Sequence, residues 1–120
     1  MYEPKYFKPS EFRCRCGNCD KGFKDMNEGL LRELDNLRER LGTPIIINSA
    51  IRCPAHNAAV GGAPKSQHLL GTATDIRAVG LPPPTVHDTL SELFPNSHGI
   101  GLYPSFVHFD VRPNKARWRK

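Results

Sequence analysis

The chain has 120 residues, of which 38% are hydrophobic and 24% charged, and its net charge is +5. These proportions are typical of one ordered domain, here residues 1–120, and they exclude a disordered chain. No apolar run approaches the roughly 20 residues that cross a bilayer, so we predict no membrane insertion.

The predicted elements begin after an irregular, cysteine-rich segment at residues 1–25. Residues 26–42 are predicted to form a helix, because leucines recur at three- and four-residue steps and a glycine follows them. Residues 44–50 are predicted to form a short buried strand, and residues 54–60 a helical turn.

The second half of the chain is predicted to supply most of the sheet. Residues 72–79 form a predicted strand, and residues 82–94 a second helix that begins with prolines. Two further strands, joined by a Pro-Ser turn, are predicted over residues 98–111. Residues 112–120 hold five basic side chains and are predicted to be a basic tail, either solvated or attracted to an anionic partner.

The last predicted strand has two different faces. Val107 and Phe109 alternate with His108 and Asp110, and on a pleated strand the two sets point to opposite sides of the sheet. One face would cover the core, and the other would present a histidine and a carboxylate. The order of elements predicts an α+β fold in which a small antiparallel sheet, flanked by helices, carries this polar face.

Two histidines and one carboxylate are sufficient protein ligands for a zinc site that keeps a position open for water. His68 would come from a loop, Asp75 from the following strand and His108 from a neighbouring strand. Gly71 would let the chain between the first two ligands turn back. The spacing alone leaves an alternative open, because a single histidine on a strand is more commonly a surface or core residue.

Two longer stretches resemble a known family. SAIRCPAHNAAVGGAPKSQHLLGTATDI and the later GIGLYPSFVHFDVR are similar to the zinc D-alanyl-D-alanine carboxypeptidases, over about residues 44–112. That family belongs to a larger group with the lysostaphin-type endopeptidases and the hedgehog signalling domain. The resemblance implies that His68, Asp75 and His108 bind zinc, and that the substrate is a peptide bond in peptidoglycan stem or cross-link peptides.

Side chains beside these ligands have further predicted roles. The resemblance implies that Arg52 contacts the substrate, since a guanidinium pairs with a carboxylate or stabilises an oxyanion; the alternative is a surface salt bridge. Gln67 is predicted to contact the substrate, and Ser66 to stabilise a turn. His56 and His87 are predicted to be structural or exposed.

The usual general base is missing from both places where relatives have one. The residue three positions before the last histidine ligand is Ser105, and the residue two positions before it is Phe106. We predict Asp110 as the base, with the alternative that its carboxylate orients a ligand histidine. His98 is the second prediction for the base, and Tyr103 is predicted to hydrogen-bond the oxyanion.

The four cysteines allow three interpretations. Cys14, Cys16 and Cys19 form a C-x-C-x2-C pattern, and Cys53 follows Arg52. Four thiolates can hold a second, structural zinc, one or two disulfides would require an oxidising compartment, and four reduced thiols are the third interpretation. We predict that Cys53 lies near the N-terminal cysteines, which would tie the irregular segment to the Arg52 segment.

Three functions are compatible with these features. The leading hypothesis is a zinc metallopeptidase, a carboxypeptidase or an endopeptidase, that acts as a monomer on peptidoglycan in the manner of a phage endolysin. The second is a zinc-bearing binding module of the same fold without catalysis. The third, a zinc-ribbon nucleic-acid binder, leaves the motif around His68 unexplained, so we predict no nucleic-acid partner.

The first 12 residues contain no apolar segment typical of a secretory signal. We expect synthesis in the cytoplasm and action on the cell wall after release, or export by a signal outside this sequence. The basic residues of the tail would then help to hold the protein on an anionic wall.

Overall fold

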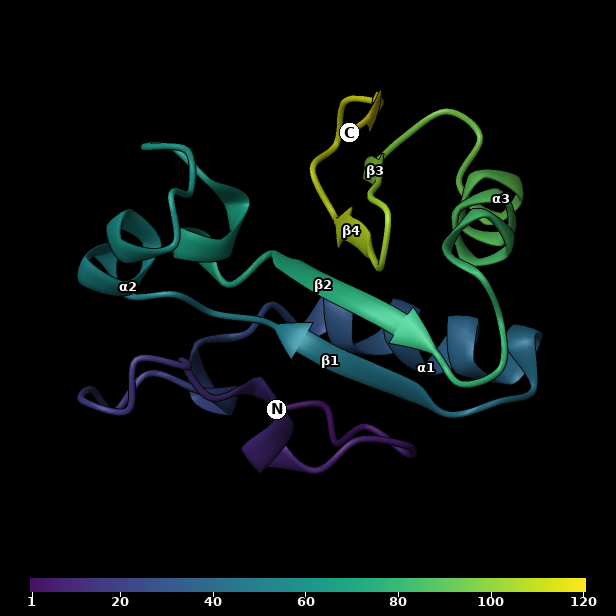
Figure 1. Ribbon diagram of the computed structural model, residues 1–120. Helices are drawn as coiled ribbons and strands as arrows, with labels where there is room; N and C mark the ends of the chain where they lie inside the picture. The colour runs from purple at the N-terminus through teal and green to yellow at the C-terminus, as the bar shows by residue number, and fades with distance from the viewer.

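The computed structural model describes residues 1–120 and has three α-helices and one five-stranded sheet (Figure 1). The helices are α1 (Glu28–Leu41), α2 (Pro54–Ala59) and α3 (Pro83–Leu93). The strands are β1 (Ile45–Ser49), β2 (Ala73–Ala78), β3 (Gly99–Leu102), β4 (Val107–Asp110) and β5 (Ala116–Arg119). The 3₁₀ turns are η1 (Pro9–Phe12), η2 (Phe23–Asp25) and η3 (Gln67–Leu70). The predicted α+β fold is confirmed, and none of the three helices is long and apolar enough to span a membrane.

The strands lie in the order β1-β2-β4-β3-β5, and the first three neighbouring pairs are antiparallel, as predicted. The fourth pair is parallel and joins β5 to β3. The prediction that residues 112–120 form a basic tail is therefore wrong, because β5 lies within them. The guanidinium of Arg117 bonds the carbonyls of Phe94 and His98 instead of reaching a partner, so part of the positive charge is used within the fold.

Helix α1 lies behind β1 and β2 in Figure 1; it begins two residues later than the predicted range of 26–42 and ends at Gly42 as predicted. The side chain of Asn27 accepts a hydrogen bond from the backbone N–H of Leu30 (3.1 Å), and Gly42 ends the helix in the left-handed conformation (φ 70°). Leu30, Leu34 and Leu37 are fully buried in a core cluster that also contains side chains of β1–β4. The helix therefore buries its leucine stripe against the sheet.

The strand register gives β2, β3 and β4 one apolar and one functional face. Asp75 lies opposite His108, which in turn lies opposite Gly101. Their neighbours Ile100 and Phe109 point to the other side and are fully buried in the core. The predicted division of β4 into an apolar face and a polar face is confirmed.

Two glycines of β3 leave the functional face open. A Cβ at Gly101 would lie 2.4 Å from the indole of Trp118, and a Cβ at Gly99 would lie 2.4 Å from the carboxylate of Asp110. Neither side chain could keep its place beside an alanine. The G-x-G pattern therefore makes room for groups from β4 and β5 that surround His108.

Candidate metal centre

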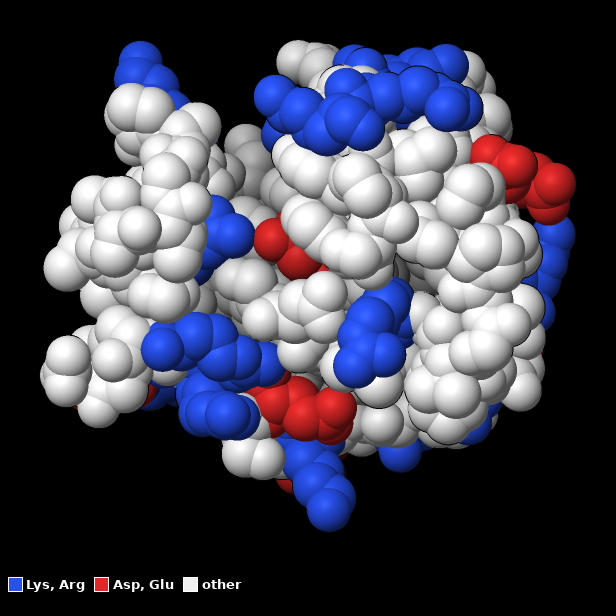
Figure 2. All heavy atoms as spheres, in the orientation of Figure 1, with Lys and Arg blue, Asp and Glu red and all other residues white.

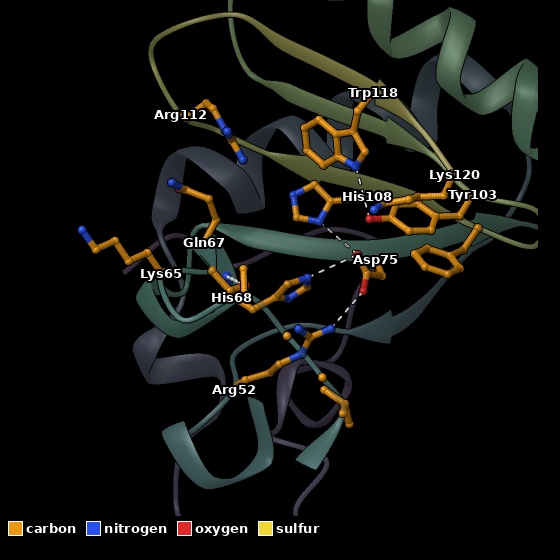
Figure 3. Close-up of a pocket in the computed structure, with 16 residues that line it drawn as sticks. Arg52, Lys65, Gln67, His68, Asp75, Tyr103, His108, Arg112, Trp118 and Lys120 are labelled. Carbon is orange, nitrogen blue, oxygen red and sulfur yellow. Dashed lines mark hydrogen bonds and ion pairs between the residues drawn. The ribbon is translucent and has the colours of Figure 1, made fainter. Parts of the chain in front are cut away.

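Three side chains from η3, β2 and β4 converge on one point (Figure 3). The ligand atoms of His68, Asp75 and His108 all lie within 4.8 Å of one another, and the three residues are buried. Nε2 of His68 and Nδ1 of His108 each lie 3.2 Å from Oδ1 of Asp75. The structure thus brings together the three residues that the sequence predicts as zinc ligands.

The other nitrogen of each imidazole is occupied by an acceptor. Nδ1 of His68 lies 2.7 Å from the carbonyl oxygen of Ala50, and Nε2 of His108 lies 2.7 Å from Oδ2 of Asp110. With a proton donated in each of these bonds, the two remaining nitrogens of the neutral rings direct lone pairs at the Asp75 carboxylate. A proton or a metal cation relieves the repulsion between these lone pairs, and two imidazoles with one carboxylate are a donor set that suits zinc. The residues present therefore fit a zinc ion.

Hydrogen bonds within this cluster shift the pKa values of two of its three side chains. Burial lowers the pKa of His108, but hydrogen bonds to Asp110 and Asp75 outweigh it and raise the pKa above its ordinary value of 6.5. Burial raises the pKa of Asp75, but hydrogen bonds from His108 and His68 outweigh it and hold that pKa well below its usual range. The carboxylate therefore stays charged, and protons compete with a metal for His108.

The sequence around His68 explains how its imidazole is placed beside Asp75 and His108. Turn η3 is capped at its start by Ser66, whose hydroxyl accepts a hydrogen bond from the backbone N–H of His68 (3.2 Å). It ends at Gly71, which has a positive φ of 73°. A Cβ at Gly71 would lie 2.0 Å from the carbonyl oxygen of Asp25, so both the conformation and the space require glycine. The predicted turn roles of Ser66 and Gly71 are confirmed.

Arg52 lies on the far side of Asp75 from the two histidines. Its Nη2 is 3.2 Å from Oδ2 of Asp75, while Nε reaches Ser49 (3.2 Å) and Nη1 reaches Asn57 (3.3 Å). Its side chain is only 13% exposed, so the pair is a buried one and not the surface salt bridge considered from the sequence. The guanidinium holds one oxygen of Asp75 and leaves the other facing the imidazoles.

Asp110 lies behind His108 rather than in front of it. Its carboxylate is fully buried and accepts hydrogen bonds from His108 Nε2 (2.7 Å), from Arg112 Nη2 (2.7 Å) and Nε (2.8 Å), and from the backbone N–H of Gly99 (3.1 Å). Nε2 and the nitrogen that faces Asp75 are on different edges of the ring. The geometry therefore favours the alternative that Asp110 orients His108, and it does not support the prediction of Asp110 as the base.

His98 points away from the convergence point, which contradicts its prediction as a base. Its ring packs against Phe94 (centroids 4.6 Å apart) and Phe109 (5.9 Å), and Nδ1 lies 3.1 Å from the carbonyl oxygen of Arg112. His98 comes one residue before β3, in a bend with a positive φ of 67°, and its contact with Phe109 places its ring on the apolar face of the sheet. That face is covered by helix α3.

A cleft of about 710 Å³ opens beside the three ligands. Gln67 and Tyr103, the predicted substrate contacts, line it together with Phe106 and Trp118. Tyr103 stacks on Phe106 (4.4 Å), and its hydroxyl accepts a hydrogen bond from Trp118 Nε1 (3.2 Å). The indole in turn lies 5.0 Å from the ring of His108, so β5 supplies one aromatic wall of the cleft.

The lining of the cleft is cationic. Figure 2 shows the hollowed face with Lys and Arg side chains on both sides of the hollow. Asp75 is the only carboxylate of the lining, and the two ligand histidines are its only imidazoles. The basic residues that line it are Arg52, Lys65, Arg112 and Lys120.

Several of these lining residues were not predicted from the sequence as part of the site. Lys65, Arg112, Trp118 and Lys120 lie in a loop or in the segment interpreted as a tail. The alternation of Ala116 and Trp118 with two arginines was the available indication of an edge strand.

The comparison with family models identifies the family. A model described as Peptidase M15 matches residues 5–110. The chain belongs to the Peptidase M15 family. The match to M15 covers the three candidate ligands, Arg52 and the cysteines, and it is to M15 as a whole rather than to the D-alanyl-D-alanine carboxypeptidases. No curated protein matches the chain.

Proposed function

We propose that this M15 protein is a zinc-dependent peptidase that hydrolyses a peptide bond in peptidoglycan stem or cross-link peptides. The observation that carries the proposal is the meeting of two imidazole nitrogens and one carboxylate beside a cationic cleft. When bound there, zinc supplies a Lewis acid and lowers the pKa of a water molecule. The proposal extends to a monomer that acts on the cell wall after release, as a phage endolysin does.

The chain's own residues would divide the remaining tasks. Asp110 accepts the Nε2 proton of His108 and so keeps Nδ1 free for the ion. Arg52 holds Oδ2 of Asp75 and lines the cleft, where part of its charge faces the substrate. Tyr103 is within the cleft wall, where its hydroxyl can hydrogen-bond a peptide carbonyl.

The charge of the cleft supports the choice of substrate. Stem peptides carry free carboxylates, and a lining of lysine and arginine attracts such groups and pairs with them. Lys65 and Lys120 add point charges to those of the two arginines. A neutral or basic peptide would gain none of this attraction.

A second candidate function is a zinc-bearing binding module that holds wall peptides without cleaving them. The observation in its favour is that the lining offers no carboxylate or histidine beyond the ligand set to act as a general base. The same cationic cleft would then serve recognition alone.

Digestion of muropeptides from several wall types, read by mass spectrometry, distinguishes these functions. Zinc-loaded wild-type protein and the His87→Ala variant should both cleave, because His87 lies on α3 outside the cleft. Chelated protein and the His68→Ala variant should not. Saturable binding without any cleavage by zinc-loaded protein would establish the binding module instead.

A further inference from the structure

The four cysteines form a second cluster, built from a different part of the chain. The sulfurs of Cys14, Cys16, Cys19 and Cys53 all lie within 4.8 Å of one another, and all four thiols are free. The first three lie between η1 and η2, and Cys53 is the N-cap of α2. Residues 39 positions apart therefore meet in space, as the sequence predicts for a bonded arrangement.

The spacing of the sulfurs fits a metal better than a disulfide. Four sulfurs held tetrahedrally at about 2.3 Å from zinc lie about 3.8 Å from one another. The Sγ atoms of Cys16 and Cys19 are 3.4 Å apart, whereas a disulfide would bring them to about 2.0 Å. A disulfide also joins only two sulfurs, and here four share one point.

Backbone N–H groups are directed at three of the sulfurs. Asn18 donates to Cys16 (3.2 Å), Cys53 donates to Cys14 (3.3 Å), and His56 donates to Cys53 (3.4 Å). A hydrogen bond to sulfur favours the thiolate, which is the form that binds metal. Four adjacent thiolates repel one another unless a cation neutralises them.

We propose that Cys14, Cys16, Cys19 and Cys53 bind a structural zinc ion through four thiolates. Four protein ligands fill a tetrahedral shell, so this site is closed and leaves no position for water, unlike the centre at His68. The proposal stands independently of peptidase activity, because it rests on a different set of residues.

The position of Cys53 links the cysteine cluster to the centre at His68. Arg52 is its neighbour, and the backbone N–H of Arg52 donates to the carbonyl oxygen of His68 (3.0 Å) while its guanidinium holds Asp75. An ion that holds Cys53 would therefore hold the segment that contacts both ligands. It would also anchor the loop of Cys14–Cys19, where backbone hydrogen bonds are few.

Metal counting on the purified full chain tests the proposal. Wild-type protein and the His87→Ala control should each hold two zinc ions per chain. The His68→Ala variant should hold one, and the Cys16→Ser/Cys19→Ser variant should also hold one. A wild-type chain with a single zinc that His68→Ala loses completely would overturn the proposal.

A second measurement works even where the cysteine variant fails to fold. Cobalt-substituted His68→Ala protein should show the intense thiolate-to-cobalt charge-transfer absorption of a tetrathiolate site. The native thiols should resist alkylation until a chelator and denaturant are added, and then all four should react. A non-reduced mass lower by two or four hydrogens would show disulfides, and rapid alkylation of all four native thiols would show unbound cysteines; either result contradicts the proposal.

Discussion

The two ligand clusters of this chain are supported in different ways. His68, Asp75 and His108 come from a turn and two paired strands. In each of them, the polar atom that faces away from the shared point is hydrogen-bonded to another part of the protein, which fixes the orientation of the side chain. The cysteines come from loops and a helix N-terminus, and their main support is the N–H groups beside the sulfurs. The comparison indicates that the first cluster is preorganised by the sheet, whereas the second contributes to the fold of its own region when it binds metal.

The donor atoms of the two clusters also suit different roles, one open to substrate and one closed. Imidazole and carboxylate donors beside a large cleft leave room for water and substrate, as catalysis needs. Four thiolates surround an ion completely and suit a structural role. If the His68 centre is preorganised and open, changes to its ligands, to the residues behind them and to the cleft wall should have different effects.

Replacing His68 by alanine should produce the largest effect. Hydrolysis of a muropeptide substrate should fall by about 10³-fold or more, because a bound metal supplies several kcal/mol of transition-state stabilisation. The circular dichroism spectrum should stay that of the wild type, since the sheet and not the ion holds this centre. Activity within tenfold of wild type would show that the centre is not catalytic.

Replacing Asp110 by asparagine tests whether the buried carboxylate orients His108 or acts as a base. An orienting role predicts a zinc affinity lower by about 10- to 100-fold, with turnover largely restored at saturating zinc. A base predicts retained zinc and turnover lower by about 10²- to 10⁴-fold at every zinc concentration. Zinc titrations followed by kcat measurements on the same samples separate the two outcomes.

Replacing Trp118 by alanine removes the aromatic wall that β5 adds to the cleft. We expect KM to rise by up to about tenfold, because an aromatic contact contributes about 0.5–1.5 kcal/mol beyond its buried area. Zinc content should not change, since Trp118 touches the ring of His108 without holding its nitrogens. Arg119→Ala is the matched control on the same strand, and an equal effect of that variant would assign the change to charge or to loss of β5.

The metal-free protein should lose a little stability as the pH rises. The pKa of His108 is raised above 6.5 in the folded state, so its protonation stabilises the fold fully below pH 6.5. This contribution disappears as the pH rises through the folded pKa, while zinc affinity increases over the same range. Thermal unfolding in chelator between pH 5 and 9 measures the first effect, and the His108→Gln variant should abolish that slope. An unchanged slope in the variant would assign it to another group.

Local patterns made much of the fold predictable. The leucine spacing of residues 26–42, with Asn27 and Gly42 at its ends, determines α1 because helix periodicity and capping act within a few residues. Strand alternation likewise determines which residues of β4 face the core. The three candidate ligands were found from a motif whose members are the residue types that zinc binds.

Long-range pairing decided the rest. Asp110 hydrogen-bonds His108 instead of facing the cleft, and His98 packs against Phe94 at the end of α3. The segment after residue 111 becomes a cleft wall only because β3 offers a free edge and Gly101 leaves space for Trp118. The sequence by itself determined the helices, the first four strands and the kinds of ligand, since these depend on near neighbours. Only the tertiary structure decided which groups meet, because strand pairing and loop packing join residues that the chain keeps far apart.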